Sequence, residues 1–236
     1  MIAINDLHKR FSKNQVLQGI DLEINQGGIF AVLGPNGSGK TTLIKCILGM
    51  VMPNKGTIQL NGKTIKSDWK YRNQIDYLPQ IANFPSNLTV TELIKMIKDL
   101  RGNKTEEDLR LIELFKLEPF LDKKLGNLSG GTKQKVNLVL TFMFNSPLII
   151  LDEPTNGLDP ISHLRLKNLI KAEKEKGKTI LITSHIMSFV EEISDEIVFL
   201  LEGKIYFKGS IAELKTKTKQ PDFEHAIASI LSSSYA

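Results

Sequence analysis

The sequence predicts an α/β fold with a mainly parallel sheet. In its second half, short apolar runs at 148–151 and 179–183 alternate with a helical pattern at 161–176. Strands that alternate with helices favour a parallel sheet covered by helices on both faces. Residues 29–33 form a continuous apolar run, as expected for a strand buried on both faces. The length of 236 residues suits one large domain with a small inserted lobe.

Composition is ordinary for a folded protein, with 41% hydrophobic and 24% charged residues. The net charge of +5 is a mild excess without a tight Lys/Arg cluster, so a solvated surface is favoured over nucleic-acid binding. Cys46 is the single cysteine, which excludes an internal disulfide and suggests a buried small residue. We recognise no signal peptide and no apolar run near the ~20 residues of a membrane span, and we expect a cytoplasmic protein.

The first sixty-five residues predict strands and turns around one helix. Apolar and polar residues alternate over 20–24, which is typical of a half-buried strand. A glycine-rich loop follows the strand at 29–33, and a helix is expected over 41–49. Another short strand is expected at 56–60, and the Asn61-Gly62 pair after it is a strong hairpin-turn signal.

A mostly helical lobe is expected at 84–128, inserted into the α/β core. Helices are predicted over 89–101 and 105–115, and each opens with a capping threonine, Thr89 or Thr105, followed by an acidic residue. The apolar residues expected to line one face of the first helix are Ile94, Ile97 and Leu100.

After the lobe, helices are expected over 131–144 and 188–193, and a hairpin is expected at 197–207. Residues 211–236 are interpreted as a polar tail that carries a short helix around 223–231.

The strongest motif is the run Gly34, Pro35, Asn36, Gly37, Ser38, Gly39, Lys40 and Thr41. It matches G-x-x-x-x-G-K-[ST] and lies between a predicted strand and a predicted helix, which a chance glycine-rich turn would not do. Glycines let backbone N–H groups surround a phosphate, and the helix N-terminus adds its positive dipole end. We expect Lys40 to reach the β- and γ-phosphates of ATP and Thr41 to bind Mg²⁺. This motif predicts a P-loop NTPase core.

Asp152 and Glu153 end the apolar run at 148–151. A buried strand would therefore deliver two carboxylates to the sheet edge where ligands bind. Asp152 is expected to hold Mg²⁺ through water, and Glu153 to polarise the attacking water as a general base. The ordinary alternative is an acidic loop start after a strand, which the upstream phosphate loop disfavours.

Ser129, Gly130 and Gly131 precede the helix predicted at 131–144. They offer a second phosphate-cradling turn at a helix N-terminus, which raises the idea that it serves a nucleotide on a partner subunit. In isolation, a plain serine N-cap is the preferred explanation of the pattern.

These motifs and their order resemble the ATP-binding subunit of ABC transporters, of the exporter-type subgroup, over about residues 1–210. The resemblance implies a P-loop core, an N-terminal antiparallel β subdomain and the inserted helical lobe. It assigns Gln80 to the Q-loop, Asp159 to the D-loop, His185 to the switch histidine and Phe11 to adenine stacking. Taken alone, such a Gln, His or Phe is ordinarily a loop, cap or core residue.

The resemblance also implies a head-to-tail dimer, homodimeric or heterodimeric, with two ATP molecules between the subunits. Each ATP would contact the phosphate loop and Thr42 of one chain and the 129–131 turn of the other. Gln80 joins Thr41 and Asp152 as an Mg²⁺ ligand, and Lys40, Glu153 and His185 form the catalytic set. A separate transmembrane subunit would dock near residues 80–100, placing this chain at the inner face of the cell membrane, with no nucleic-acid partner.

Two departures and two alternatives accompany this interpretation. Thr132 stands where glutamine is common, and Phe11 where tyrosine is common; Thr132 is expected to alter contacts across the dimer. A non-transport ABC ATPase acting on a macromolecular complex is disfavoured, because Gln80 and Ser129 are too close for a coiled-coil insertion. A regulator without turnover is disfavoured by Glu153 and His185. Within exporters, copper-site or metallo-enzyme maturation is one open possibility.

Overall fold

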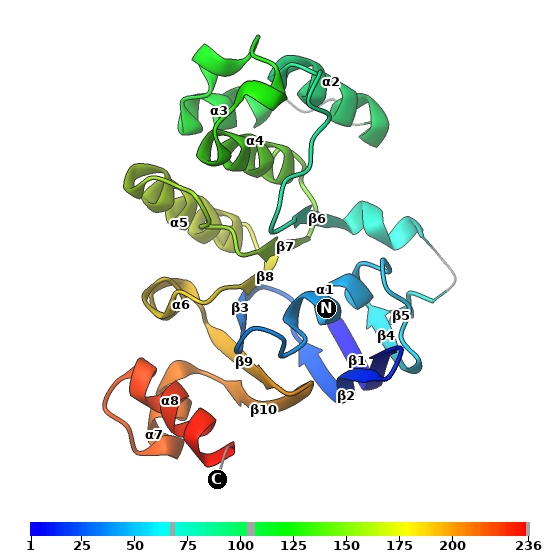
Figure 1. Cartoon of the computed structure of the whole chain (residues 1–236), viewed down its shortest axis with the longest axis vertical. Helices are drawn as coiled ribbons and strands as arrows, with labels where there is room; N and C mark the ends of the chain where they lie inside the picture. Colours follow the sequence, from blue (N-terminus) through cyan, green and yellow to red (C-terminus); the bar gives the residue numbers. More distant parts are fainter. Residues whose placement is uncertain (67–68, 103–106, 235–236) are drawn as a thin grey trace.

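The computed structural model describes residues 1–66, 69–102 and 107–234, and its strands form two sheets (Figure 1). The four-stranded sheet is antiparallel, in the order β2-β1-β4-β5. Its strands are β1 (Ile2–Phe11), β2 (Asn14–Ile24), β4 (Lys55–Leu60) and β5 (Lys63–Thr64). The predicted Asn61-Gly62 turn joins the last two, with positive φ at both residues, as a two-residue hairpin turn requires.

The six-stranded sheet has the order β10-β9-β3-β8-β7-β6. Its neighbours run parallel except at the β10 edge, so the predicted α/β fold with a mainly parallel sheet is confirmed. Its strands are β3 (Gly28–Leu33), β6 (Ile75–Leu78), β7 (Leu148–Asp152), β8 (Thr179–Thr183), β9 (Glu196–Leu201) and β10 (Lys204–Gly209).

The helices are α1 (Lys40–Ile47), α2 (Val90–Arg101), α3 (Glu107–Phe115), α4 (Gly130–Phe142), α5 (Pro160–Glu175), α6 (Met187–Ile193), α7 (Ile211–Thr218) and α8 (Phe223–Ser234). Of these, α1 packs on one face of this sheet, and α4, α5 and α6 pack on the other. Short 3₁₀ turns are η1 (Lys70–Gln74), η2 (Glu118–Phe120) and η3 (Leu125–Asn127). Within the described ranges, no helix has the length and apolar character needed to cross a membrane.

Strand β3 divides the core into two clusters. Ile29, Ala31 and Leu33 face a cluster that includes α4, α5 and α6, whereas Phe30 and Val32 face one shared with α1 and the antiparallel sheet. The strand is buried on both faces, as its continuous apolar run predicts. The loop after β3 is therefore held by a strand with little freedom to move.

The first lobe helix begins at its predicted cap, and it buries part of the predicted face. Thr89 and Glu92 form the expected capping box, in which the Thr89 backbone N–H donates to Glu92 Oε2 at 2.8 Å. Leu100, expected on the same face as Ile94 and Ile97, is 76% exposed, whereas Ile94 is buried and Ile97 is partly buried against the core. The residues of this helix that are buried are Val90, Leu93 and Ile94. The predicted cap at Thr105 lies outside the described residues.

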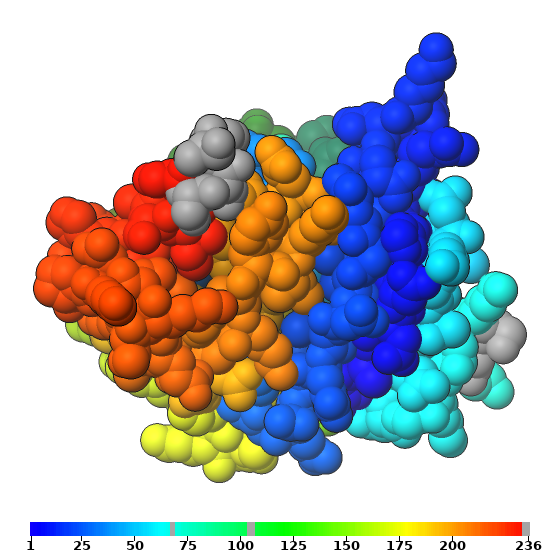
Figure 2. Space-filling model, turned by 90° about the horizontal axis from the view of Figure 1, so that it is seen from below, coloured from blue at the N-terminus to red at the C-terminus, as the bar shows by residue number. Residues whose placement is uncertain are grey.

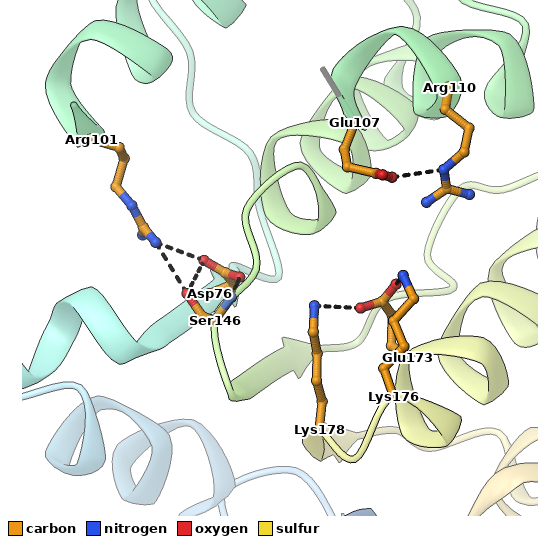
Figure 3. Close-up of polar contacts among 8 residues, drawn as sticks. All are labelled: Asp76, Arg101, Glu107, Arg110, Ser146, Glu173, Lys176 and Lys178. Atoms are coloured by element: carbon orange, nitrogen blue, oxygen red, sulfur yellow. Dashed lines mark hydrogen bonds and ion pairs between the residues drawn. The ribbon is translucent and has the colours of Figure 1, made fainter. Parts of the chain in front are cut away.

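Arg101, at the end of α2, ties the lobe to the sheet edge (Figure 3). Its guanidinium donates to Asp76 Oδ1 at 3.0 Å and to Ser146 Oγ at 3.1 Å, and it lies 4.4 Å from the ring centre of Phe144. Asp76 is buried on β6, and burial raises the pKa of its carboxyl although Ser146 and Arg101 oppose the shift. The buried Asp76 carboxylate thus links strand β6 to the end of α2 and to the loop that contains Ser146.

Residues 211–234 fold against the domain instead of forming a polar tail. Two helices, α7 and α8, pack together near α6, and Figure 2 shows this segment in orange and red gathered on one side of the molecule. Phe223 is fully buried with Ala226 and Ile227 in the cluster that contains α6. The sequence signal for α7 was a capping box at Ser210 and Glu213, which the structure forms.

Candidate active site

The loop between β3 and α1 has a backbone that only glycine allows. Gly34 has φ 148°, and a Cβ there would lie 2.0 Å from the carbonyl oxygen of Leu200. Gly39, the N-cap of α1, has φ 108° and would place a Cβ 2.9 Å from Leu17. No side chain in the described part of the chain caps this helix, so its first N–H groups are available to an anion.

Lys40 folds back over the loop. Its Nζ donates to the carbonyl oxygens of Gly34 at 2.8 Å and of Pro35 at 3.1 Å. Burial lowers the pKa of the Lys40 ammonium, and the charges of Glu153 and Asp152 oppose that shift. Because the Lys40 ammonium is partly shielded from water, its electrostatic attraction to an approaching polyphosphate is strong.

A pocket of about 160 Å³ gathers half of the predicted residues in one place. It opens where β3 and β7 end, the usual ligand side of a parallel sheet. Its lining residues are Asn36, Gly37, Gly39, Lys40, Thr41, Thr42, Gln80, Asp152 and Glu153.

Asp152 has one oxygen that the protein satisfies and one that it does not. Thr183 Oγ1 donates to Oδ1 at 2.5 Å, whereas Oδ2 is buried without a hydrogen-bond partner among the described residues. A buried carboxylate oxygen left in this way suits a hard cation such as Mg²⁺, which prefers oxygen ligands and keeps several waters. Thr41 and Gln80 line the same pocket and supply further oxygens.

Glu153 lies in a constrained backbone position directly after the strand. Its φ is 52°, and its N–H donates to the carbonyl oxygen of Thr183 at 3.1 Å. The carboxylate is nearly buried and meets His185, whose Nδ1 lies 2.7 Å from Oε2. A carboxylate fixed in this way can polarise a water at the pocket mouth.

The 129–131 turn lies at the N-terminus of α4 and not in this pocket. Ser129 caps the helix by accepting from the backbone N–H of Thr132 at 3.3 Å. A Cβ on Gly131 would lie 2.6 Å from the carbonyl oxygen of Gly157, so the turn sits directly on the loop that leads to Asp159.

Two residues that the sequence analysis did not single out strengthen the contact between the start of α4 and the loop before Asp159. Gln134 Nε2 donates to the carbonyl oxygen of Pro154 at 3.0 Å, and Lys135 pairs with Asp159 at 2.7 Å. The hydrogen bond from Lys135 is the main reason that the pKa of the Asp159 carboxyl is lowered. Gln134 and Lys135 follow Gly131 by three and four residues, so they lie on the same face of the helix as Gly131. This spacing was the sequence signal that could have identified them.

Phe11 and Asp159 also lie outside the pocket lining. Phe11 ends β1, is 47% exposed and has Lys9 Nζ 4.8 Å from its ring centre. Part of the N-terminal sheet projects beyond the neighbouring surface (Figure 2). Core packing, the ordinary explanation for this aromatic residue, therefore does not apply to Phe11.

A glycine loop that joins a buried parallel strand to a helix, with a lysine and two strand-end carboxylates beside it, defines a P-loop NTPase. Comparison with known proteins narrows this class. The sequence profile described as ABC transporter matches residues 17–156. The chain therefore belongs to the ABC transporter family, and it is an ATP-hydrolysing subunit of that family.

Two relatives are similar over most of the chain. The Nod factor export ATP-binding protein I of Burkholderia orbicola is 33% identical over 89% of this chain and 70% of its own length. The lantibiotic transport ATP-binding protein SrtF of Streptococcus pyogenes is 33% identical over 87% of this chain and 89% of its own.

Solved structures agree on the fold. One described as the ATP binding subunit of an ABC transporter superposes with a TM-score of 0.90 at 30% identity, covering 97% of this chain and 98% of the other. A dimeric ATP-binding cassette bound to ADP and Pi superposes with a TM-score of 0.80 at 24% identity, over 89% of this chain and 98% of that one.

Proposed function

We propose that this chain hydrolyses ATP between two such subunits, in a homodimer or heterodimer, and so drives a separate membrane-spanning transporter subunit. The observation that supports this most directly is the separation of two phosphate-binding elements in one chain. The pocket around Lys40 does not include Ser129, Gly130 or Gly131. A second chain that supplies the 129–131 turn would complete the site.

Within that site each predicted residue has a role its position suits. Lys40 and the loop amides neutralise the polyphosphate, while Asp152, Thr41 and Gln80 hold Mg²⁺, which stabilises charge on the phosphates. Glu153 orients and deprotonates the attacking water, and His185 fixes the Glu153 carboxylate while its exposed ring edge contacts the γ-phosphate. Phe11 stacks on adenine.

We place the docking surface for the membrane subunit in a groove beside the Q-loop. The groove has a volume of about 390 Å³ and lies between the lobe and the sheet edge. Its apolar walls include Met50, Phe84, Ile97, Leu140 and Phe144. Pro79, next to Gln80, also lines the groove. Movement of a docked helix would therefore shift Gln80, the proposed Mg²⁺ ligand.

The relative named for Nod factor export favours an exporter over an importer, and the other relative is named for lantibiotic transport. Their substrates differ in chemistry, so neither transfers to this chain, and metallo-enzyme maturation stays a prediction. The proposed location is the cytoplasmic face of the membrane, bound to the transporter subunit. The ATPase domain is proposed to cover residues 1–210, with the lobe at 84–128 inserted and α7 and α8 packed against it.

The test combines turnover, assembly and coupling. ATP with Mg²⁺ should convert the Glu153→Gln chain from monomer to dimer in light scattering, and the wild-type chain should release phosphate. Ile97→Glu should prevent co-purification with the membrane subunit, whereas Leu100→Glu, on the same helix but outside the groove, should not. A chain that neither hydrolyses ATP nor dimerises would refute the proposal.

A further inference from the structure

Thr132 makes two contacts to Ser129 that together occupy one hydroxyl. Its backbone N–H donates to Ser129 Oγ at 3.3 Å, and its own Oγ1 lies 2.9 Å from the same atom. The first contact is the ordinary helix cap. The second depends on the side chain at position 132, because only a short hydroxyl side chain at the third helical residue ends at this point.

The positions of the two hydroxyl protons decide whether Ser129 presents a hydrogen-bond donor or an acceptor to a ligand. A serine hydroxyl has one proton and two acceptor lone pairs. When the Thr132 hydroxyl donates, both lone pairs of Ser129 Oγ are filled from its own chain. The proton of Ser129 is then the only group left to point away from the helix.

The opposite arrangement would be poor for an anion. If Ser129 donated to Thr132, it would present a lone pair outward, and a phosphate oxygen, which only accepts, would meet another acceptor. A phosphate in front of the turn therefore selects the arrangement in which Thr132 donates to Ser129 and Ser129 donates to the phosphate. Such a chain of hydrogen bonds is mutually polarising.

The turn is also held in place from behind. Gly131 packs on the Gly157 carbonyl, and the contacts of Gln134 with Pro154 and of Lys135 with Asp159 fix the first two turns of α4. With the backbone of α4 held in this way, the Ser129 hydroxyl can still rotate, and its contact with Thr132 Oγ1 bears on its orientation.

We propose that Thr132 is a positioning residue that directs the Ser129 hydroxyl proton toward the polyphosphate of an ATP bound on a second chain. The inference rests on the proposed function, which places the 129–131 turn against the partner's nucleotide. Thr132 itself touches no substrate and acts through Ser129 alone.

The test compares Thr132→Val, which keeps the shape and loses the hydroxyl, with Thr132→Ser, which keeps the hydroxyl. Thr132→Val should raise the ATP concentration for half-maximal turnover about three- to tenfold, the effect of one hydrogen bond. Its kcat should stay within about twofold of wild type, because the contact is made equally in the ground and transition states. Thr132→Ser should match wild type, and the melting temperatures should agree because the backbone cap is retained.

A double-mutant cycle shows whether the effect passes through Ser129. In a Ser129→Ala background, Thr132→Val should change nothing further. An equal loss in that background, a fall in kcat alone, or a Thr132→Ser chain as weak as Thr132→Val would overturn the inference. ATP-dependent dimerisation of the wild-type chain distinguishes a failure of the proposed function from a failure of this inference alone. If it fails, the proposed function falls and takes this inference with it; if it holds while Thr132→Val is unaffected, only the inference fails.

Discussion

The imidazole of His185 and the carboxylate of Glu153 meet at 2.7 Å between Nδ1 and Oε2, across two neighbouring strand ends of the parallel sheet. The acid is nearly buried, whereas the histidine side chain is 64% exposed. The contact therefore holds the acid at the pocket mouth and leaves one edge of the ring toward solvent. A water activated by Glu153 would lie next to a residue able to contact the phosphate being transferred.

Glu153→Gln should lower ATP turnover by at least about 100-fold while ATP binding persists, because the amide keeps the shape and cannot accept the proton of water. Phosphate release measures turnover, and fluorescent-nucleotide titration measures binding. Glu202→Gln, an exposed acid elsewhere, is the matched control. Unchanged turnover in Glu153→Gln would show that another group is the base.

Lys40→Ala should weaken ATP binding by roughly 10- to 100-fold, the range for a hydrogen bond to a charged group. The loop itself should keep its shape, because its backbone is set by the close approaches at Gly34 and Gly39. Calorimetric titration with ATP checks the affinity. Lys45→Ala on the same helix should bind as wild type; if both variants did, the loop would not be the nucleotide site.

Cys46 should make folding stability depend on pH in the alkaline range. Burial raises the pKa of its thiol from 9.0 to about 11, so between these values the unfolded chain loses a proton that the folded chain keeps. Its contribution is therefore complete below pH 9 and falls by about 1.4 kcal/mol for each pH unit up to about 11. Urea unfolding at pH 8 and 10.5 measures it.

The Cys46→Ala chain isolates this effect, because lysines and tyrosines titrate in the same range in both proteins. The difference in stability between wild type and Cys46→Ala should shrink at the higher pH. The same burial predicts a thiol that a maleimide labels only after unfolding. Rapid labelling of the folded chain at pH 8 would contradict both statements.

Arg101→Met should destabilise the domain by about 3 kcal/mol, because it leaves the buried Asp76 carboxylate without its cation. Chemical unfolding gives the free energy. Adding Asp76→Asn should recover much of the loss, since the amide still bonds Ser146 and carries no charge. A double variant as unstable as the single one would mean that Arg101 acts through packing on Phe144.

Phe223→Ala should cost about 3–5 kcal/mol, the range for removing a fully buried aromatic ring. Thermal unfolding should show one transition at lower temperature, because α8 shares a core cluster with α6. Leu231→Ala, near the end of α8 and only partly buried, is the milder control. No effect at Phe223 would support the independent tail expected from the sequence.

Local sequence was sufficient wherever neighbouring residues decide the structure. The glycine loop, the capping box at Thr89 and the turn at Asn61-Gly62 each follow from backbone preferences within a few residues. The apolar runs of β3, β7 and β8 likewise predict buried strands without knowledge of their partners. The main residues of the pocket could be predicted for this reason.

Side-chain periodicity failed where burial depends on what else the chain brings nearby. Leu100 has the spacing of a buried residue, yet its side chain is 76% exposed, and Phe223 lies in a polar segment, yet α6 lies against it. Exposure is a property of the assembled fold, because it is set by elements distant in sequence.

The sequence by itself determined the phosphate loop, the two strand-end carboxylates and the kind of sheet that carries them. Only the tertiary structure decided that Gly131, Gln134 and Lys135 hold α4 against the loop that leads to Asp159. It also decided that the 129–131 turn lies outside the pocket of its own chain. Backbone conformation follows from local sterics, whereas contacts between distant segments depend on how the core packs.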